Sequence, residues 1–91
     1  MNMKYDGSKS IFITNHAKEQ CKERGVAAEE VIKTIQEQAW IAAKKNRLEC
    51  KASYPYTDFW NGQFYTNKEV RPKFVEEEKE IVVVTVYVYY N

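Results

Sequence analysis

Cysteine and histidine are scarce in this chain, and their scarcity excludes two classes of small protein. Two cysteines and one histidine among 91 residues are too few for a disulfide framework or a zinc-binding set of ligands. We therefore expect no bound metal and no cofactor. We expect the two thiols, Cys21 and Cys50, to be reduced and buried.

Long apolar runs are also missing. The longest, IVVVTVYVYY at residues 81–90, is too short and too rich in β-branched residues for a membrane helix. The opening stretch MNMKYDGSKS has lysines but no apolar segment after them, as a signal peptide would need. We expect a cytoplasmic protein with no membrane partner.

Neither sign of charge is in clear excess. Fourteen basic and thirteen acidic residues give a net charge of +1, which argues against a surface covered in positive charge to hold nucleic acid. The charge is nevertheless polarised, because KKNRLECK (44–51) is basic and EEEKE (76–80) is acidic. The length predicts a single domain over residues 1–91, with 1–9 a loose lead-in.

The first half of the chain predicts one strand and two helices. SIFIT (10–14) is short and apolar, as in a strand. Thr14 or Asn15 can cap a helix from His16 to about Arg24, with Gly25 as its left-handed end. A second helix begins in AAEEVIKTIQEQA (27–39) and ends between Gln38 and Lys45.

The second half predicts a sheet. Two strand-like stretches, 47–60 and 63–75, flank Asn61-Gly62, a dipeptide favoured in tight hairpin turns. Residues 81–90 predict a buried, central strand, whereas Pro72 argues for an edge or a bulge in the strand before it. The order β-α-α-β-β-β indicates an α+β fold, with two N-terminal helices packed on a three- or four-stranded antiparallel sheet.

One helical stretch carries a family resemblance. HAKEQCKERGV (16–26) resembles the pattern HA-x-x-R-x-x-x-R-G-I at the start of the bacterial domain-of-unknown-function family numbered 4258. NRLEC, WNGQFYTNKEV and IVVVTVYVYY are similar to the β-region of that family. The family looks related to RelE/ParE-like toxins, which implies a RelE-like fold, a cognate antitoxin as partner, and RNA or the ribosome as target. Gln20 departs from the pattern, because it replaces the first arginine and cannot supply its charge.

The same stretch contains the first candidate catalytic residues. His16, Gln20 and Arg24 recur every four residues along one helix, and a helix start favours a neutral imidazole that can accept a proton. Metal-free RNA cleavage needs a base, a cation and an acid. We predict His16 as the base. The candidate cations are Arg24, Lys45 and Arg47, and the candidate acids are Tyr65, Tyr87 and Lys68. The predicted catalytic set is His16, Arg24 and Tyr87, and the predicted RNA contacts are Lys45, Arg47, Tyr65 and Lys68.

Each of these assignments has a structural alternative. The His16 ring can bond a strand carbonyl, Arg24 can answer the helix dipole, and KKNR can be a solvated turn. Tyrosines at 54, 56, 65, 87, 89 and 90 can stack on bases or serve as core and cross-strand pairs. Two functions follow: a metal-independent endoribonuclease of a toxin–antitoxin system, or a non-catalytic protein-binding module. The near-neutral charge and Gln20 favour the module, but the family resemblance makes the endoribonuclease the primary prediction and the module the alternative.

Overall fold

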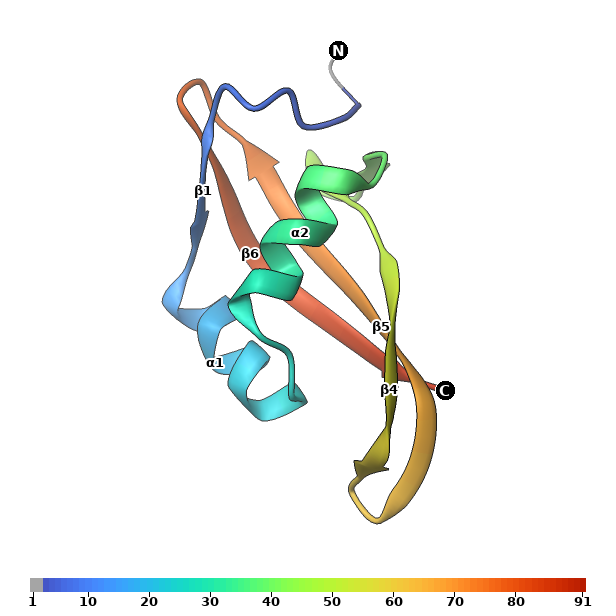
Figure 1. Cartoon of the computed structure of the whole chain (residues 1–91). Coiled ribbons are helices and arrows are strands. Elements are labelled where there is room, and N and C mark those ends of the chain that lie inside the picture. The colour runs from blue at the N-terminus through green and yellow to red at the C-terminus, as the bar shows by residue number, and fades with distance from the viewer. Residues whose placement is uncertain (1–2) are drawn as a thin grey trace.

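The fold is α+β, as predicted, in a computed structural model that describes residues 3–91. Two helices near the N-terminus are followed by most of a sheet (Figure 1). The elements are β1 (Ser10–Ile13), α1 (Asn15–Arg24), α2 (Ala28–Glu37), β2 (Ile41–Ala43), β3 (Arg47–Glu49), β4 (Ala52–Trp60), β5 (Gln63–Glu76) and β6 (Glu80–Tyr90).

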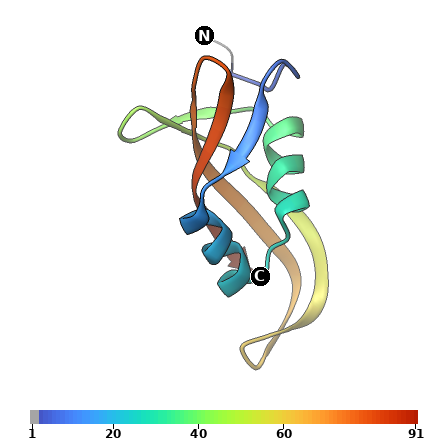
Figure 2. The same ribbon diagram turned by 90° about the vertical axis from the view of Figure 1, so that its left-hand side faces the viewer.

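The sheet is larger than the three or four antiparallel strands expected. Six strands in the described part of the chain form one sheet in the order β1-β6-β5-β3-β2, and β4 continues along β5 beyond β3. The β1 strand runs parallel to β6, beside which it lies in Figure 2, and the other pairs are antiparallel. The predicted strand 47–60 divides into β3 and β4, and β2 was not predicted. The sheet is therefore mixed.

Local signals set the limits of α1 as predicted. The Thr14 hydroxyl accepts a hydrogen bond from the Ala17 N–H at 3.2 Å and caps the helix start. Gly25, with φ of 73°, ends the helix in the left-handed conformation. Ala17 and Cys21 lie on the buried face, and α1 sits beside β6.

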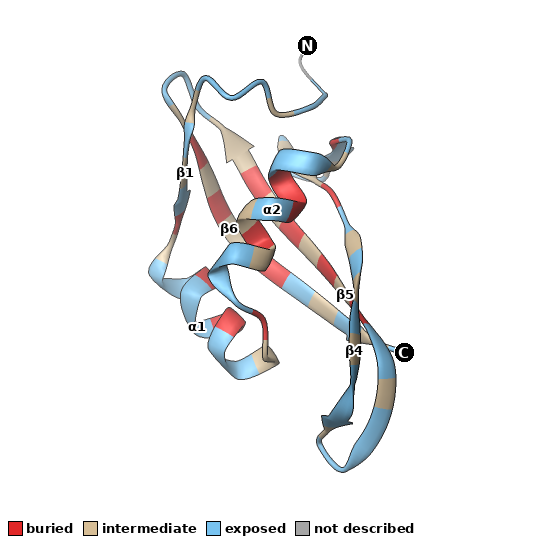
Figure 3. Ribbon diagram, viewed as in Figure 1, coloured by how far each residue is buried: buried red, intermediate tan, exposed pale blue. Residues whose placement is uncertain are grey.

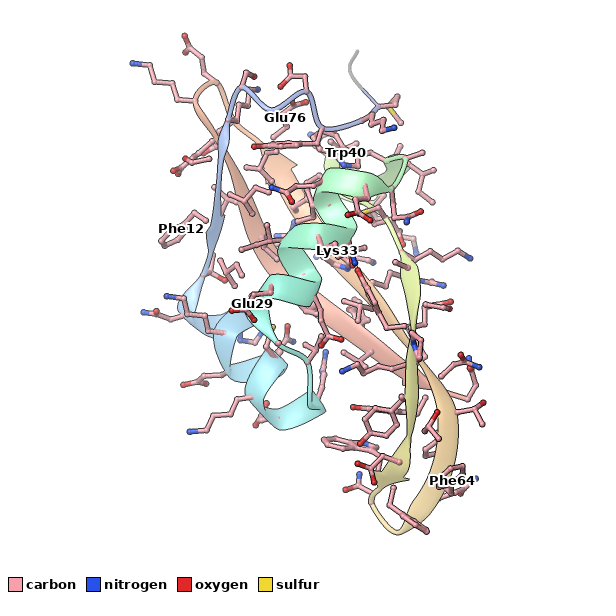
Figure 4. The ribbon with its side chains drawn as sticks, in the orientation of Figure 1. Phe12, Glu29, Lys33, Trp40, Phe64 and Glu76 are labelled. Carbon is pink, nitrogen blue, oxygen red and sulfur yellow. The ribbon has the colours of Figure 1, made fainter. Side chains whose placement is uncertain are left out.

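The second helix lies across β5 and closes the core (Figure 1). The carboxylate of Glu30 accepts the Ala27 N–H at 2.9 Å, which makes up for the missing side-chain cap at Ala27. The helix ends at Glu37, close to the early limit expected. Trp40 then packs under the helix end, where its indole N–H donates to the Ile35 carbonyl at 2.9 Å. Figure 4 labels Trp40 in this position.

The core lies between the helices and one face of the sheet. Figure 3 shows the buried positions of β5 and β6 behind α2. The strand residues fully buried on this face are Val70, Pro72, Phe74, Ile81, Val83 and Val86. Strand alternation places their neighbours on the opposite face. We call this opposite side of β5 and β6 the open face, since both helices pack on the other side.

The expected edge position of Pro72 is corrected. The β5 strand is internal, with β6 on one side and β3 and β4 on the other. Pro72 lies where the neighbouring chain passes from β3 to β4, and its carbonyl accepts the Cys50 N–H at 3.4 Å. The missing N–H of proline therefore falls at a break between two strands. The expected irregularity lies one residue on, since the register shifts between Lys73 and Phe74.

The turn at Asn61-Gly62 joins β4 and β5 as predicted. Both residues have positive φ, 50° and 83°, as the favoured two-residue hairpin turns require. The end of this hairpin extends beyond the helices (Figure 1), so the molecule is elongated, at 42 × 24 × 23 Å. Phe64, labelled in Figure 4, lies near the hairpin end.

Candidate nucleic-acid interface

Two polar side chains of α1 hold the free edge of β6. The β1 strand ends at Ile13, so its pairing with β6 stops at Val83. Three residues further along this edge, the Gln20 amide oxygen accepts the Val86 N–H at 2.9 Å, and the Arg24 Nη1 donates to the Val86 carbonyl at 2.6 Å. The two side chains thus provide the hydrogen bonds that a neighbouring strand would make.

Gln20 is a structural residue that the sequence motif did not identify as one. It is only 9% exposed, in keeping with its place on the helical stripe that contains Ala17 and Cys21. That stripe was the available signal, because it puts residue 20 on the face turned toward the sheet. The residue that departs from the family pattern therefore bonds the backbone of β6.

Tyr87 lies between two cations on the open face. Its ring is 36% exposed. The Arg24 Cζ lies 5.6 Å from the ring centroid, and the Lys73 Nζ lies 5.2 Å from it. Both distances are within the range of a cation–π contact. The structure thus brings together two of the three predicted catalytic residues, Arg24 and Tyr87.

A second contact between a cation and a tyrosine ring lies two residues further along β5 and β6. The Arg71 Cζ is 5.3 Å from the Tyr89 ring centroid, and Tyr89 is 47% exposed. Arg71 also donates from Nη2 to the Glu69 carboxylate at 2.9 Å. Arg71 pairs with Tyr87 across the strands, and Glu69 pairs with Tyr89. Aromatic rings and guanidinium groups therefore alternate over the middle of the open face.

Cations outnumber acids around the two tyrosines. Arg24, Arg71 and Lys73 are three cations, and Glu69 and Glu49, the register partner of Lys73, are two acids, so the cluster carries 3 − 2 = +1. A local positive field attracts phosphate whatever the net charge of the protein. Exposed tyrosine rings beside such cations are suited to stacking on the bases of single-stranded RNA.

His16 lies apart from this cluster. It is an exposed residue in the first turn of α1. It has no hydrogen bond or ion pair with the described residues, so the expected bond to a strand carbonyl is not formed. Eight residues separate it from Arg24, which corresponds to about 12 Å along a helix. The imidazole and the guanidinium therefore do not meet at one phosphate.

Lys45 and Arg47 lie at the turn between β2 and β3. Lys45 is exposed and has a φ of 62°. Arg47 is half-buried and lines a hollow of about 330 Å³ together with Asn46 and Glu76. The register pairs Glu49 with Lys73. Strand alternation then puts Arg47 on the open face, two residues from Glu49 along β3.

Lys68 and Tyr65 belong to the inner side of the hairpin. Lys68 is 7% exposed, and its Nζ donates to the Glu30 carboxylate at 2.9 Å and to the Gly25 carbonyl at 3.0 Å. The Tyr65 ring lies 5.6 Å from the ring of Tyr90. The ammonium of Lys68 is thus already occupied by the end of α1 and by α2.

Aromatic packing fastens the hairpin to the end of α1. The Trp60 ring stacks on Tyr90 with centroids 4.9 Å apart. The Tyr90 hydroxyl donates to the Arg24 carbonyl at 2.6 Å. Burial raises the pKa of Tyr90 to about 12. This arrangement satisfies a carbonyl at the helix end and positions the backbone of Arg24 beside the sheet.

Neither the two thiols nor the possible metal ligands of residues 3–91 form a further reactive site. Cys21 and Cys50 are free and buried. Burial raises the pKa of both thiols, that of Cys50 to about 12, so neither is a ready thiolate. Over residues 3–91, no three His, Cys, Asp or Glu side chains are grouped to hold a metal ion. Within the same residues, no helix is long and apolar enough to cross a membrane.

Sequence reasoning named Tyr89 only as one of several tyrosines, and it missed Arg71 and Lys73. The signal was present, because these residues stand at alternate positions in two strands. Their juxtaposition with Tyr87 requires the register of β5 on β6, in which Lys73 pairs with Thr85. A sequence without known pairing does not supply that register.

The chain matches the model of a known protein family. The model of a domain of unknown function, DUF4258, matches residues 13–88 of the chain. The matched range includes α1, α2 and nearly all of the open face. No curated protein and no solved structure gives a significant match.

Proposed function

We propose, from the premise that the chain belongs to the DUF4258 family, that its open face binds single-stranded RNA and cleaves it without a metal ion. In this proposal the protein is a RelE-like toxin whose cognate antitoxin covers the same face. The observation that carries the proposal is the position of Tyr87 between Arg24 and Lys73 on an exposed part of the sheet.

The reaction proposed for Arg24, Lys73 and Tyr87 is transfer of a phosphoryl group from the 5′-oxygen to the 2′-oxygen within the RNA. The 2′-oxygen attacks the adjacent phosphorus, and the bond from phosphorus to the 5′-oxygen breaks. The products are a 2′,3′-cyclic phosphate and a 5′-hydroxyl. The 2′-hydroxyl proton goes to solvent, and the Tyr87 hydroxyl protonates the leaving oxygen and is reprotonated by water. Lys73 and Arg24 stabilise the negative charge of the transition state.

The test separates the hydroxyl of Tyr87 from its ring. Purified protein is incubated with single-stranded RNA in excess EDTA, and the ends of the products are identified. Tyr87→Phe keeps the ring between the cations, so we expect RNA binding to persist while cleavage falls about 10²- to 10⁴-fold, as for loss of a general acid. Equal cleavage by Tyr87→Phe and the parent would contradict the role of the hydroxyl.

A matched pair of substitutions tests the role of the Lys73 charge. Lys73→Gln is expected to weaken both binding and cleavage, whereas Lys79→Gln, with the same change in charge at an exposed turn, leaves them close to the parent. Growth provides the second readout. Expression of the chain alone should arrest cells, and co-expression of a small neighbouring gene should relieve the arrest. No cleavage and no arrest would end the nuclease proposal.

A second candidate is a non-catalytic protein-binding module. The observation in its favour is the exposed pair Phe59 and Phe64 near the hairpin end, 64% and 48% exposed, with rings 5.4 Å apart. Exposed aromatic pairs are typical anchors of protein interfaces. A purified chain that binds no RNA, but loses a protein partner on Phe59→Ser, would favour this candidate.

His16, Lys45, Arg47, Tyr65 and Lys68 stay predictions within the nuclease proposal. The paired ammonium of Lys68 and the distance of His16 from Arg24 give both residues low priority. Lys45 and Arg47 extend the basic surface toward the β2–β3 turn. Alanine substitutions at these two residues are expected to weaken RNA binding without altering the product ends.

A further inference from the structure

We propose that a hollow at the margin of the open face is a guanine pocket, which selects the RNA strand bound by the tyrosines and cations. This inference rests on the proposed RNA binding. The hollow measures about 300 Å³ and lies between the end of α2, β2, β3 and β5. Its volume is at the small end of the range for ligand pockets, roughly 300–1,000 Å³. The hollow is therefore large enough for one nucleobase but too small for several nucleotides.

The hollow is continuous with the open face. Arg71 belongs to both, because it lines the hollow while its Cζ lies 5.3 Å from the Tyr89 ring centroid. Glu49, which also lines the hollow, pairs in register with Lys73, which lies beside Tyr87. Neighbouring strands are about 4.8 Å apart. A base next to one stacked on Tyr89 thus reaches the hollow by crossing a single strand.

Glu49 is the residue that suggests the ligand. It is half-buried at the hollow, and it makes no hydrogen bond or ion pair with the described residues. Of the four other half-buried glutamates, Glu30, Glu69 and Glu76 each have a basic partner, whereas Glu80, at the start of β6, has none among the described residues. Half-buried carboxylates are normally satisfied by a donor. A carboxylate repels phosphate, so within RNA it can bind only the N–H groups of the bases or the hydroxyl groups of the sugars.

Guanine fits this carboxylate better than the other bases. Its Watson–Crick edge has two adjacent N–H donors, which a carboxylate accepts with both oxygens. Adenine and cytosine each place a ring-nitrogen acceptor beside their amino donor, and uracil has a single N–H between two carbonyls. The third group of the guanine edge is the acceptor O6. Lys51 and Arg71 line the same hollow and can donate to it.

The walls of the hollow complete the match. Ala39 and Ile41 contribute apolar surface for the faces of a base, and Ile41 is 57% exposed. Gln38 adds an amide with both donor and acceptor capacity. An exposed apolar wall with a few polar groups at one side is the usual construction of a small-ligand site.

The experiment measures base preference and not total affinity. Fluorescence anisotropy compares a labelled oligouridine carrying one central guanosine with the same strand carrying one central adenosine. The parent protein is expected to prefer guanosine about tenfold or more, in line with one bidentate contact to a base. Glu49→Gln should abolish the preference and leave the affinity for plain oligouridine unchanged. Glu78→Gln, an exposed acid in the β5–β6 turn, is the matched control and should keep the preference.

A second variant fills the hollow without touching the charge. Ile41→Trp is expected to remove the preference as Glu49→Gln does, with binding of oligouridine retained as evidence of an intact fold. Equal binding of the two oligonucleotides, or a preference that survives both variants, would overturn the guanine pocket while the proposed RNA binding stands. Failure of the parent to bind any oligonucleotide would overturn the proposed function and the pocket with it.

Discussion

Gly25→Ala is expected to destabilise the fold far more than Gly62→Ala, although both glycines have the same backbone strain. Gly25 has a φ of +73°, and a Cβ there would lie 2.7 Å from the Trp60 Cζ3 and 2.7 Å from the Tyr90 hydroxyl oxygen. Gly62 has a φ of +83° with nothing within 4 Å of an added Cβ. The two substitutions therefore separate a steric clash from the cost of left-handed geometry.

The magnitude follows from what must move. Left-handed geometry costs an alanine about 1 kcal/mol or slightly more at either position. At Gly25, Trp60 and Tyr90 must also leave their preferred rotamers, at about 0.5–1.5 kcal/mol each. Tyr90 loses its hydrogen bond to the Arg24 carbonyl, now 2.6 Å, which is another cost of about 1 kcal/mol. We expect a total of about 3–5 kcal/mol for Gly25→Ala.

The assay is urea unfolding followed by tryptophan fluorescence, with a thermal scan by circular dichroism. A domain of 91 residues has a total stability of about 5–14 kcal/mol, so the loss is large. The melting temperature should fall by roughly 12–40 °C for Gly25→Ala and by roughly 4–8 °C for Gly62→Ala. Equal losses for the two variants would refute the packing of Trp60 and Tyr90 against the end of α1.

Two further predictions concern the same region. Lys68→Met should lower the free energy of unfolding, measured in urea, by about 2–4 kcal/mol. This loss is somewhat below that for a fully buried ion pair, because the Glu30 side chain is 26% exposed and can turn to water. Lys79→Met is the control, and a similar small loss in both variants would contradict the ion pair. Stability should fall as pH rises from about 9 toward 12, because the folded-state pKa values of Cys50 and Tyr90 are both raised to about 12 and the unfolded chain loses these protons first. Urea midpoints measured at several alkaline pH values should decline less steeply for Tyr90→Phe and for Cys50→Ala, and a flat profile in the parent would contradict the burial of these groups.

The elements that sequence reasoning located correctly are those with local signals. The start of α1 rests on one hydroxyl, that of Thr14, and its end on Gly25, so nothing distant is needed to place either. The Asn61-Gly62 turn is equally local, because both residues tolerate positive φ.

The β2–β3 hairpin was missed because its signals are weak. Each of the two strands has three residues. Their turn uses positive φ at Lys45 and Asn46, 62° and 59°, with no glycine. Lysine seldom adopts that conformation, so the pattern of residues did not indicate a tight turn. Pairing of β3 with β5 stabilises the hairpin, and this pairing is tertiary.

The candidate site also has residues that the sequence identified and residues that only the strand pairing revealed. Arg24 and Tyr87 were selected from a helical motif and a strand, and the structure puts the guanidinium over the ring. Their partners Lys73 and Arg71 depend on a register shift that leaves Val84 without a partner in β5. Side chains of these two consecutive strands meet only through such details of pairing. The sequence also grouped His16 with Arg24, but two helical turns keep the side chains apart.

By itself, the sequence determined the α+β class, the limits of α1, the hairpin turn and the chemistry of the side chains available to a site. These properties follow from interactions within a few residues. The tertiary structure alone decided which face of the sheet stays uncovered, which cations lie over Tyr87 and Tyr89, and that Glu49 lies beside a hollow with no partner among residues 3–91. Strand register and helix packing set those relations, and both depend on contacts between residues far apart in the chain.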